Sequence, residues 1–183
     1  RAELSVFYYA LFSWRAQPES KPGYRAFSIA EAAGYGQFAL LIGLALLCEG
    51  VPVHLLVHRA SPTAAWVVTA LDVYGLLWVA ALWRSVQLRP ILAGESDLVL
   101  RAGFLWRVEI PRAAIVSVRR SAGSGPDRQT PGYLRLTVLN EPQWLVELAE
   151  PVEAHGPLGR RRRVSLIGIA VDDCALFSTI FDT

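Results

Sequence analysis

The chain has 183 residues, 53% of them hydrophobic, and a net charge of +2 at pH 7. Its mean hydropathy of +0.33 is high for a soluble domain. The length suits one domain plus a membrane element, and so small a net charge argues against general attraction to nucleic acid. Lys21 is the only lysine among the 18 Lys and Arg residues, which is typical of a GC-rich bacterial genome. No Met occurs, so we expect the sequence to be a fragment.

Residues 1–27 form a predicted N-terminal juxtamembrane segment ahead of the first long apolar stretch. Its aromatic run VFYYALFSW (6–14) is too short to cross a membrane alone. Two interpretations stay open for this run, an interfacial helix or the end of a further membrane span.

Two apolar stretches of twenty residues each follow, at 38–57 and 64–83. At a rise of ~1.5 Å per residue, a helix of that length spans the ~30 Å hydrocarbon core of a bilayer. The short link HRASPT allows only an antiparallel arrangement, so the sequence predicts a two-helix transmembrane hairpin over 28–87. The alternative is a buried hairpin in a soluble domain, but nothing else in the chain is large enough to cover it.

Basic residues flank the outer ends of both stretches: Arg15, Lys21 and Arg25 before the first, Arg84 and Arg89 after the second. The link between the stretches carries only Arg59. The positive-inside rule therefore predicts that both termini are cytoplasmic. With the bacterial composition, this places the protein in the bacterial cytoplasmic (inner) membrane.

Polar residues interrupt the hairpin. Glu49 and Asp72 both lie ~12 Å below its outer end, where two carboxylates could share a proton, bind a cation or meet a basic group of another chain. His54 lies about 140° around the helix from Glu49, so only a kink at Gly50–Pro52 would bring them together. The sequence thus predicts a membrane-embedded polar site of Glu49, His54 and Asp72, with a purely structural role as the alternative.

The two histidines of the first stretch raise a second possibility. His54 and His58 are four residues apart and share one helical face, a spacing that can ligate a metal. Alternatively, His54 forms a hydrogen bond to the neighbouring helix and His58 lies at the interface. We expect no other cofactor.

Beyond residue 88 the sequence changes to short alternating runs broken by turns, which predict seven antiparallel strands. The runs are 88–93, 98–101, 104–110, 113–120, 133–139, 144–148 and 163–171. Phe104, Trp106, Val108 and Ile110 share one face of their run, as do Leu134, Leu136 and Val138. We expect Phe104, Trp106, Leu136 and Val138 to be inside. Asp172 and Asp173 can cap a final helix, whose apolar stripe is Leu176, Phe177, Ile180 and Phe181. The predicted fold class is α+β, a transmembrane hairpin followed by a seven-strand barrel over 88–183 that the C-terminal helix closes.

The run RPILAGESDLVLRAGFLWRVEIPRAAIVSVRR (89–120) resembles the start of bacterial PH-like domains, and VSLIGIAVDDCALFSTIF (164–181) is similar to their last strand and helix. This resemblance implies a cytoplasmic PH-like domain over 88–183. The whole chain also resembles uncharacterised bacterial membrane proteins, in motifs that contain Glu49, His54, Ala65, Trp66, Pro151 and Gly156. That group has no activity to carry over, so the resemblance informs the fold more than the function.

Lipid-binding PH domains hold inositol phosphates with basic residues in the first strand turn, where this chain has the acidic AGESD (93–97). A phosphoinositide pocket is therefore not expected there. The other candidate is Arg160, Arg161, Arg162 and Arg163, since each Arg near an anionic leaflet contributes ~1 kcal/mol. The alternative is a solvated loop. No aromatic platform or recognition motif accompanies the arginines, so a nucleic-acid partner is not expected.

Two hypotheses follow for function. The first is a membrane-anchored, non-catalytic PH-like module that binds a protein, a lipid or another copy of itself. The second is a membrane-embedded site for a proton, cation or small ligand, which the PH-like domain regulates. An enzyme is not expected, because the sequence has no nucleophile elbow, glycine-rich phosphate loop or paired-Cys metal signature.

Overall fold

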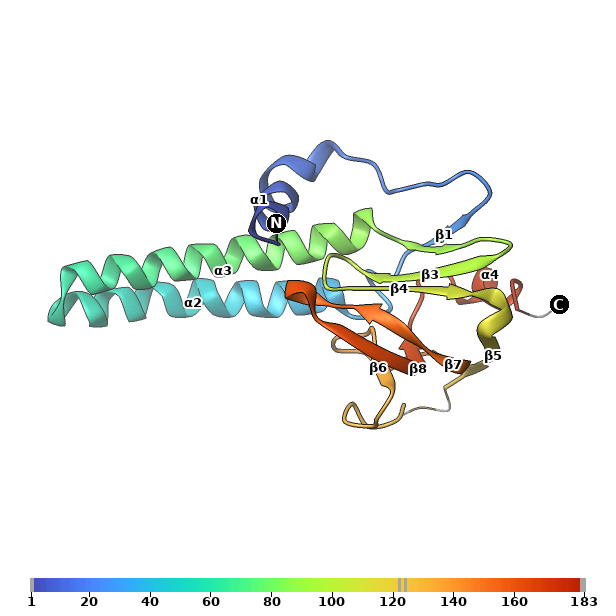
Figure 1. The fold of residues 1–183 in the computed structure, drawn as a ribbon. Coiled ribbons are helices and arrows are strands. Elements are labelled where there is room, and N and C mark those ends of the chain that lie inside the picture. The colour runs from blue at the N-terminus through green and yellow to red at the C-terminus, as the bar shows by residue number, and fades with distance from the viewer. Residues whose placement is uncertain (1, 122, 124, 182–183) are drawn as a thin grey trace.

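The computed structural model describes residues 2–121, 123 and 125–181. A long helical hairpin projects from a β-sheet domain, and the N-terminal helix α1 lies beside α3 (Figure 1). The helices are α1 (Ala2–Phe7), α2 (Tyr35–Ala60), α3 (Pro62–Leu88) and α4 (Cys174–Ser178). Short helical turns are η1 (Tyr8–Phe12), η2 (Ser13–Arg15), η3 (Arg112–Ala114) and η4 (Pro157–Gly159).

The strands form one mixed, open sheet of eight strands in the order β1-β2-β3-β4-β7-β8-β6, with β5 paired to β7. They are β1 (Arg25–Phe27), β2 (Ile91–Ala93), β3 (Asp97–Ala102), β4 (Trp106–Pro111), β5 (Ile115–Arg120), β6 (Tyr133–Arg135), β7 (Trp144–His155) and β8 (Arg161–Ile169). The α+β class is confirmed. The prediction of seven antiparallel strands is wrong in two respects, because β1 adds a strand beside β2 and β6 runs parallel to β8.

Loop hydrogen bonds connect the two ends of this sheet. The Asp172 amide, just after β8, donates to the Ser28 carbonyl just after β1 at 2.9 Å. The Val138 amide, just after β6, donates to the Ala33 carbonyl at 2.9 Å. Residues that follow β1 therefore belong to the core of the sheet domain, and Ile29 and Ala33 are buried there with the strands.

The helical hairpin has the length and composition that the sequence predicts. Both α2 and α3 are long and apolar enough to cross a membrane, and the most apolar part of α2 is not buried within the chain. Ser61 separates the helices and caps α3, where its side chain accepts a hydrogen bond from the Ala64 amide. Pro62 then occupies the first turn of α3, where a missing N–H costs nothing.

No linker separates α3 from the sheet domain. The last turns of α3 enter the domain core, where Leu82 and Val86 are buried among the strand residues. Gly103, in the turn between β3 and β4, lies so close to α3 that an added Cβ would be 2.3 Å from the Ser85 hydroxyl oxygen. The sheet domain is thus packed directly on the end of a hairpin helix.

The N-terminal segment packs along the domain end of α3. Val6 and Ala10 form a small buried cluster with Ala81. The Arg84 guanidinium donates to the carbonyls of Ser13, Trp14 and Ala16 and so satisfies the end of this helical segment. Several large apolar side chains remain exposed here, namely Leu4, Phe7, Tyr8, Leu11, Phe12 and Trp14.

The predicted core is confirmed in part. Val108, Ile110, Leu134 and Leu136 are buried, and Val138 is partly buried. Phe104 and Trp106 are only partly buried, because Phe104 lies in the turn before β4 and Trp106 is the first residue of that strand.

The final helix, α4, is too short to contain all four residues of the predicted apolar stripe. Phe177 is fully buried, but Leu176 is 43% exposed, because α4 makes little more than one turn and buries a single position. Asp173 caps α4 by accepting from the Leu176 amide. Asp172 does not cap it, and its carboxylate instead accepts from the Ser28 hydroxyl and the Ala32 amide.

Candidate functional site

An apolar groove of about 370 Å³ lies between the outer halves of α2 and α3. Three polar side chains line it, those of His54, Thr69 and Asp72. Intramembrane polar groups are costly unless they find partners, so this groove is the candidate membrane-embedded site.

His54 has such a partner. Its Nδ1 atom lies 2.6 Å from the Thr69 hydroxyl oxygen on α3, and its ring meets the Trp66 ring edge-on at 5.2 Å between centroids. The His58 ring lies 5.7 Å away. No group of three or more His, Cys, Asp or Glu side chains is arranged to hold a metal ion within the part of the chain that the structure describes. His54 thus has a hydrogen-bond partner on the neighbouring helix α3, which is the structural alternative to metal binding by this histidine.

Asp72 and Glu49 occupy different surroundings. One carboxylate oxygen of Asp72 is 3.5 Å from where a Cβ on Gly50 would lie, so this glycine lets the carboxylate approach α2 closely. Glu49 is adjacent in sequence, yet its side chain is exposed and lies outside the groove. Because α2 continues unbroken through Pro52, the angular separation of Glu49 and His54 remains. The structure brings His54 and Asp72 to one groove and leaves Glu49 outside it.

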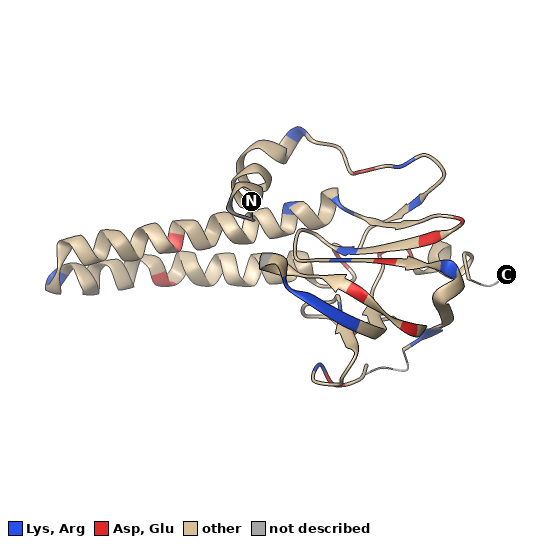
Figure 2. Ribbon diagram, in the orientation of Figure 1, with Lys and Arg blue, Asp and Glu red and all other residues tan. Residues whose placement is uncertain are grey.

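The predicted arginine cluster begins in the turn after β7 and continues into β8. Figure 2 shows this basic stretch along β8 at the side of the sheet from which the helices project. Arg160, Arg161 and Arg163 are exposed. Arg162 points to the opposite face of the sheet, where it donates to the Thr130 carbonyl at 3.5 Å. Three of the four arginines are therefore available at the surface.

The pairing register adds further basic residues to this edge. Arg101 on β3, Arg107 on β4, His155 on β7 and Arg161 on β8 are direct cross-strand neighbours, each opposite the next. Direct neighbours share one face of a sheet. The sequence interpretation missed Arg107 and His155, since no spacing along the chain shows which residues of separate strands lie opposite each other. Arg101 is not available, because it is buried and paired to Glu19 at 2.6 Å.

The acidic turn at 94–97 lies at the other end of β3. Its Asp97 carboxylate accepts a hydrogen bond from the Tyr24 hydroxyl at 2.5 Å, and this bond lowers the pKa of Asp97. The Lys21 ammonium lies over the Tyr24 ring at 3.8 Å. Tyr24 thus contacts both the acidic turn and Lys21, the only lysine of the chain.

Comparison with known proteins gives no family assignment. No protein-family model matches the chain, and no curated protein or solved structure is significantly similar to it. The function is therefore inferred from the geometry of the helical hairpin, the groove and the basic edge of the sheet.

Proposed function

We propose that this protein is a membrane-anchored, non-catalytic interaction module of the bacterial cytoplasmic membrane, with both termini in the cytoplasm. The observation that carries the proposal is the continuity of α3, which runs from the outer end of an apolar hairpin into the core of the sheet domain. A domain attached in this way has a fixed orientation to the bilayer, as expected of a module that presents one surface to a partner.

We further propose that the sheet domain is PH-like, with the sheet curved into a barrel. The order of strands β2 to β8 followed by a short helix supports this proposal, as do the loop hydrogen bonds that link the two ends of the sheet. The ligand classes that suit such a module are a lipid, a protein or a second copy of the chain.

The topology is tested by cysteine labelling of intact cells. After Cys48 and Cys174 are replaced by Ala, a membrane-impermeant maleimide should label Ser61→Cys, at the link between the helices, but not Gly125→Cys in the sheet domain. Both positions should react once the cells are permeabilised, which controls for buried thiols. Labelling of Gly125→Cys in intact cells would contradict the proposed orientation.

A second function, a membrane-embedded binding site, has one observation in its favour. His54 and Asp72 share a groove that is otherwise apolar, within the part of the hairpin expected to cross the membrane, where ionisable groups are costly. We expect such a site to bind a proton or a cation through Asp72, with His54 beside it and Glu49 contributing from outside the groove.

The double variant Glu49→Gln with Asp72→Asn separates the two functions. Amides keep hydrogen-bonding capacity but cannot ionise, so an interaction module should fold and bind its partner as before. An embedded site should instead fold normally and lose cation or proton binding. The measurement is metal content and proton uptake of purified wild type beside the variant, with His54→Ala as a further comparison. If wild type carries no metal and both proteins titrate alike, the embedded site is excluded and the module remains.

A further inference from the structure

The turn between β7 and β8 lies at the level of the lipid headgroups if the hairpin spans the membrane. From Pro62 to Arg84, α3 extends ~33 Å, which covers the hydrocarbon core and puts Arg84 at the inner boundary. Ser85, the next residue, accepts a hydrogen bond from the Phe104 amide of the β3–β4 turn. The sheet domain therefore begins at the boundary between the hydrocarbon core of the bilayer and the lipid headgroups.

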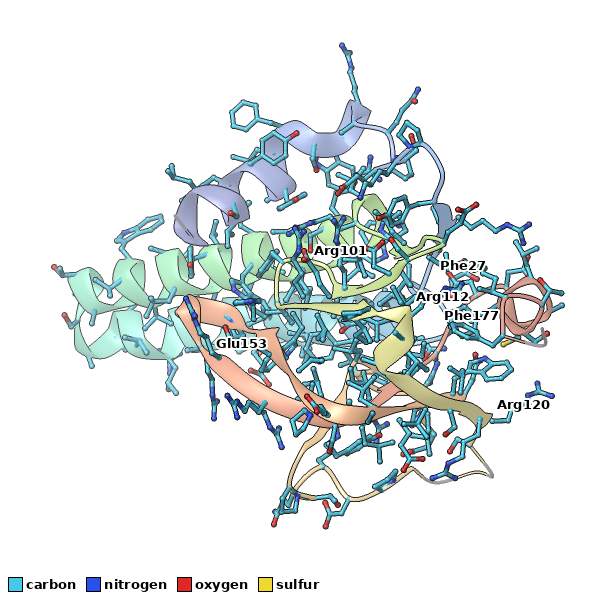
Figure 3. The ribbon with its side chains drawn as sticks, turned by 45° about the vertical axis from the view of Figure 1, so that its right-hand side comes forward. Phe27, Arg101, Arg112, Arg120, Glu153 and Phe177 are labelled. Atoms are coloured by element: carbon cyan, nitrogen blue, oxygen red, sulfur yellow. The ribbon has the colours of Figure 1, made fainter. Side chains whose placement is uncertain are left out.

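A series of packing contacts connects this end of α3 with the β7–β8 turn. Trp106 begins β4, two residues after Phe104, and an added Cβ on Gly156 would lie 2.7 Å from the Trp106 ring. Gly156 is the first residue after β7, and its amide donates to the Arg160 carbonyl at 2.6 Å. In Figure 3 the label of Glu153 lies on this hairpin at the helix side, whereas Arg120 lies at the opposite end of the domain.

The charges at this edge favour an anionic surface. Arg107, His155, Arg161 and Arg163 share one face of the sheet, and Arg160 lies in the adjoining turn. Acidic neighbours compensate part of this charge. Glu109 pairs with Arg107, and Glu153 lies 3.1 Å from Arg161 and 3.6 Å from His155.

Two arginines at this edge form no ion pair with a described residue, although Glu153 on β7 lies directly opposite Arg163 in the strand register. Arg160 and Arg163 are exposed, and neither forms an ion pair with any residue that the structure describes. Exposed arginines without a carboxylate partner are suited to bidentate recognition of phosphate oxygens.

We propose that the β7–β8 turn, with Arg160 and Arg163 as its principal contacts, binds the phosphates of anionic lipids in the same leaflet from which α3 emerges. This inference rests on the proposed membrane anchor and names the partner of one surface of the module. The contact holds the sheet domain against the membrane at a second point, separate from α3. Each arginine contributes about fivefold to the apparent binding of an anionic surface.

The experiment compares the full chain in nanodiscs of phosphatidylcholine alone and in nanodiscs that also contain phosphatidylglycerol. Hydrogen–deuterium exchange of the peptide covering residues 155–163 is the readout. We expect exchange to be several-fold slower in the anionic discs and to return toward the neutral-disc rate at high salt, because salt screens headgroup contacts.

Variants identify the residues. Arg160→Gln with Arg163→Gln should abolish the difference between the two discs. The matched control, Arg25→Gln with Arg119→Gln, removes the same charge from β1 and β5, where Arg25 is opposite Ala93 and Arg119 is opposite Leu145. These positions lie away from the β7–β8 turn, so the control should behave as wild type.

Three outcomes would overturn the proposal. Equal exchange of inserted wild type in both discs would exclude the lipid contact while leaving the anchor intact. Slower exchange in neutral discs on addition of inorganic phosphate would mean that the turn recognises a soluble anion instead. Failure of the chain to insert into discs of either composition would contradict the membrane anchor, and the lipid contact with it.

Discussion

Replacing Phe177 by Ala should lower the free energy of unfolding by about 3–5 kcal/mol, the cost of truncating a buried aromatic. Phe177 is fully buried, and its ring meets those of Phe27 at 5.3 Å, Trp144 at 5.6 Å and Phe181 at 5.2 Å between centroids. These rings come from β1, β7 and the C-terminal segment, so the cavity would open where the first and last parts of the sheet domain meet. For a domain of ordinary stability, about 5–15 kcal/mol, this is a large fraction.

The measurement is thermal unfolding of the full chain in detergent, followed by near-ultraviolet circular dichroism. We expect a fall in Tm of roughly 6–20 °C. Leu176→Ala is the matched control, because it truncates the neighbouring side chain of the same helix at a position that is 43% exposed. An unchanged Tm for Phe177→Ala would mean that α4 does not close the sheet domain in solution.

Replacing Gly103 by Ala should destabilise the attachment of the sheet domain to α3 by about 2–5 kcal/mol. Gly103 has φ +56°, in the left-handed region of the backbone, and holding an alanine in this conformation costs about 1–2 kcal/mol. Its Cβ would also lie 2.3 Å from the Ser85 hydroxyl oxygen and 3.0 Å from a Val86 methyl carbon, and overpacking of this kind adds about 1–3 kcal/mol.

Gly23→Ala isolates the steric part of this effect. Gly23 has φ +78°, but nothing lies within 4 Å of an added Cβ, so only the conformational strain applies. Denaturant unfolding of both variants, with exchange of the amides of β3 and β4 as a local probe, measures the difference. Equal destabilisation by the two substitutions would show that the β3–β4 turn is not tightly packed on α3.

The hairpin was predictable because a twenty-residue apolar stretch has few structural solutions. The stretches 38–57 and 64–83 lie inside α2 and α3. The strands after residue 88 were also recognisable, since alternation of apolar and polar side chains identifies a half-buried strand. The second half of β7 was missed because its side chains are mostly exposed, so pairing with β8 rather than burial defines it.

β1 could not be found from its own residues. Arg25–Phe27 is too short for a periodic pattern. It becomes a strand only by pairing with β2, which is separated from it by the 63 residues 28–90, a segment that includes the hairpin. For the groove residues, the rise per residue of a helix predicts how deep each side chain lies. The rotation of the helix about its own axis depends instead on which of its faces packs against the neighbouring helix. Gly50 and His54 face α3, and this rotation puts Glu49 outside.

The uninterrupted course of α3 has a mechanical consequence. A transmembrane helix changes its tilt when the thickness of the hydrocarbon core changes. Because α3 continues without a break from the apolar hairpin into the core of the sheet domain, a change in the tilt of α3 would tilt the sheet domain by the same angle. In the proposed topology, thinning or thickening of the bilayer would therefore move the β7–β8 turn toward or away from the lipid headgroups.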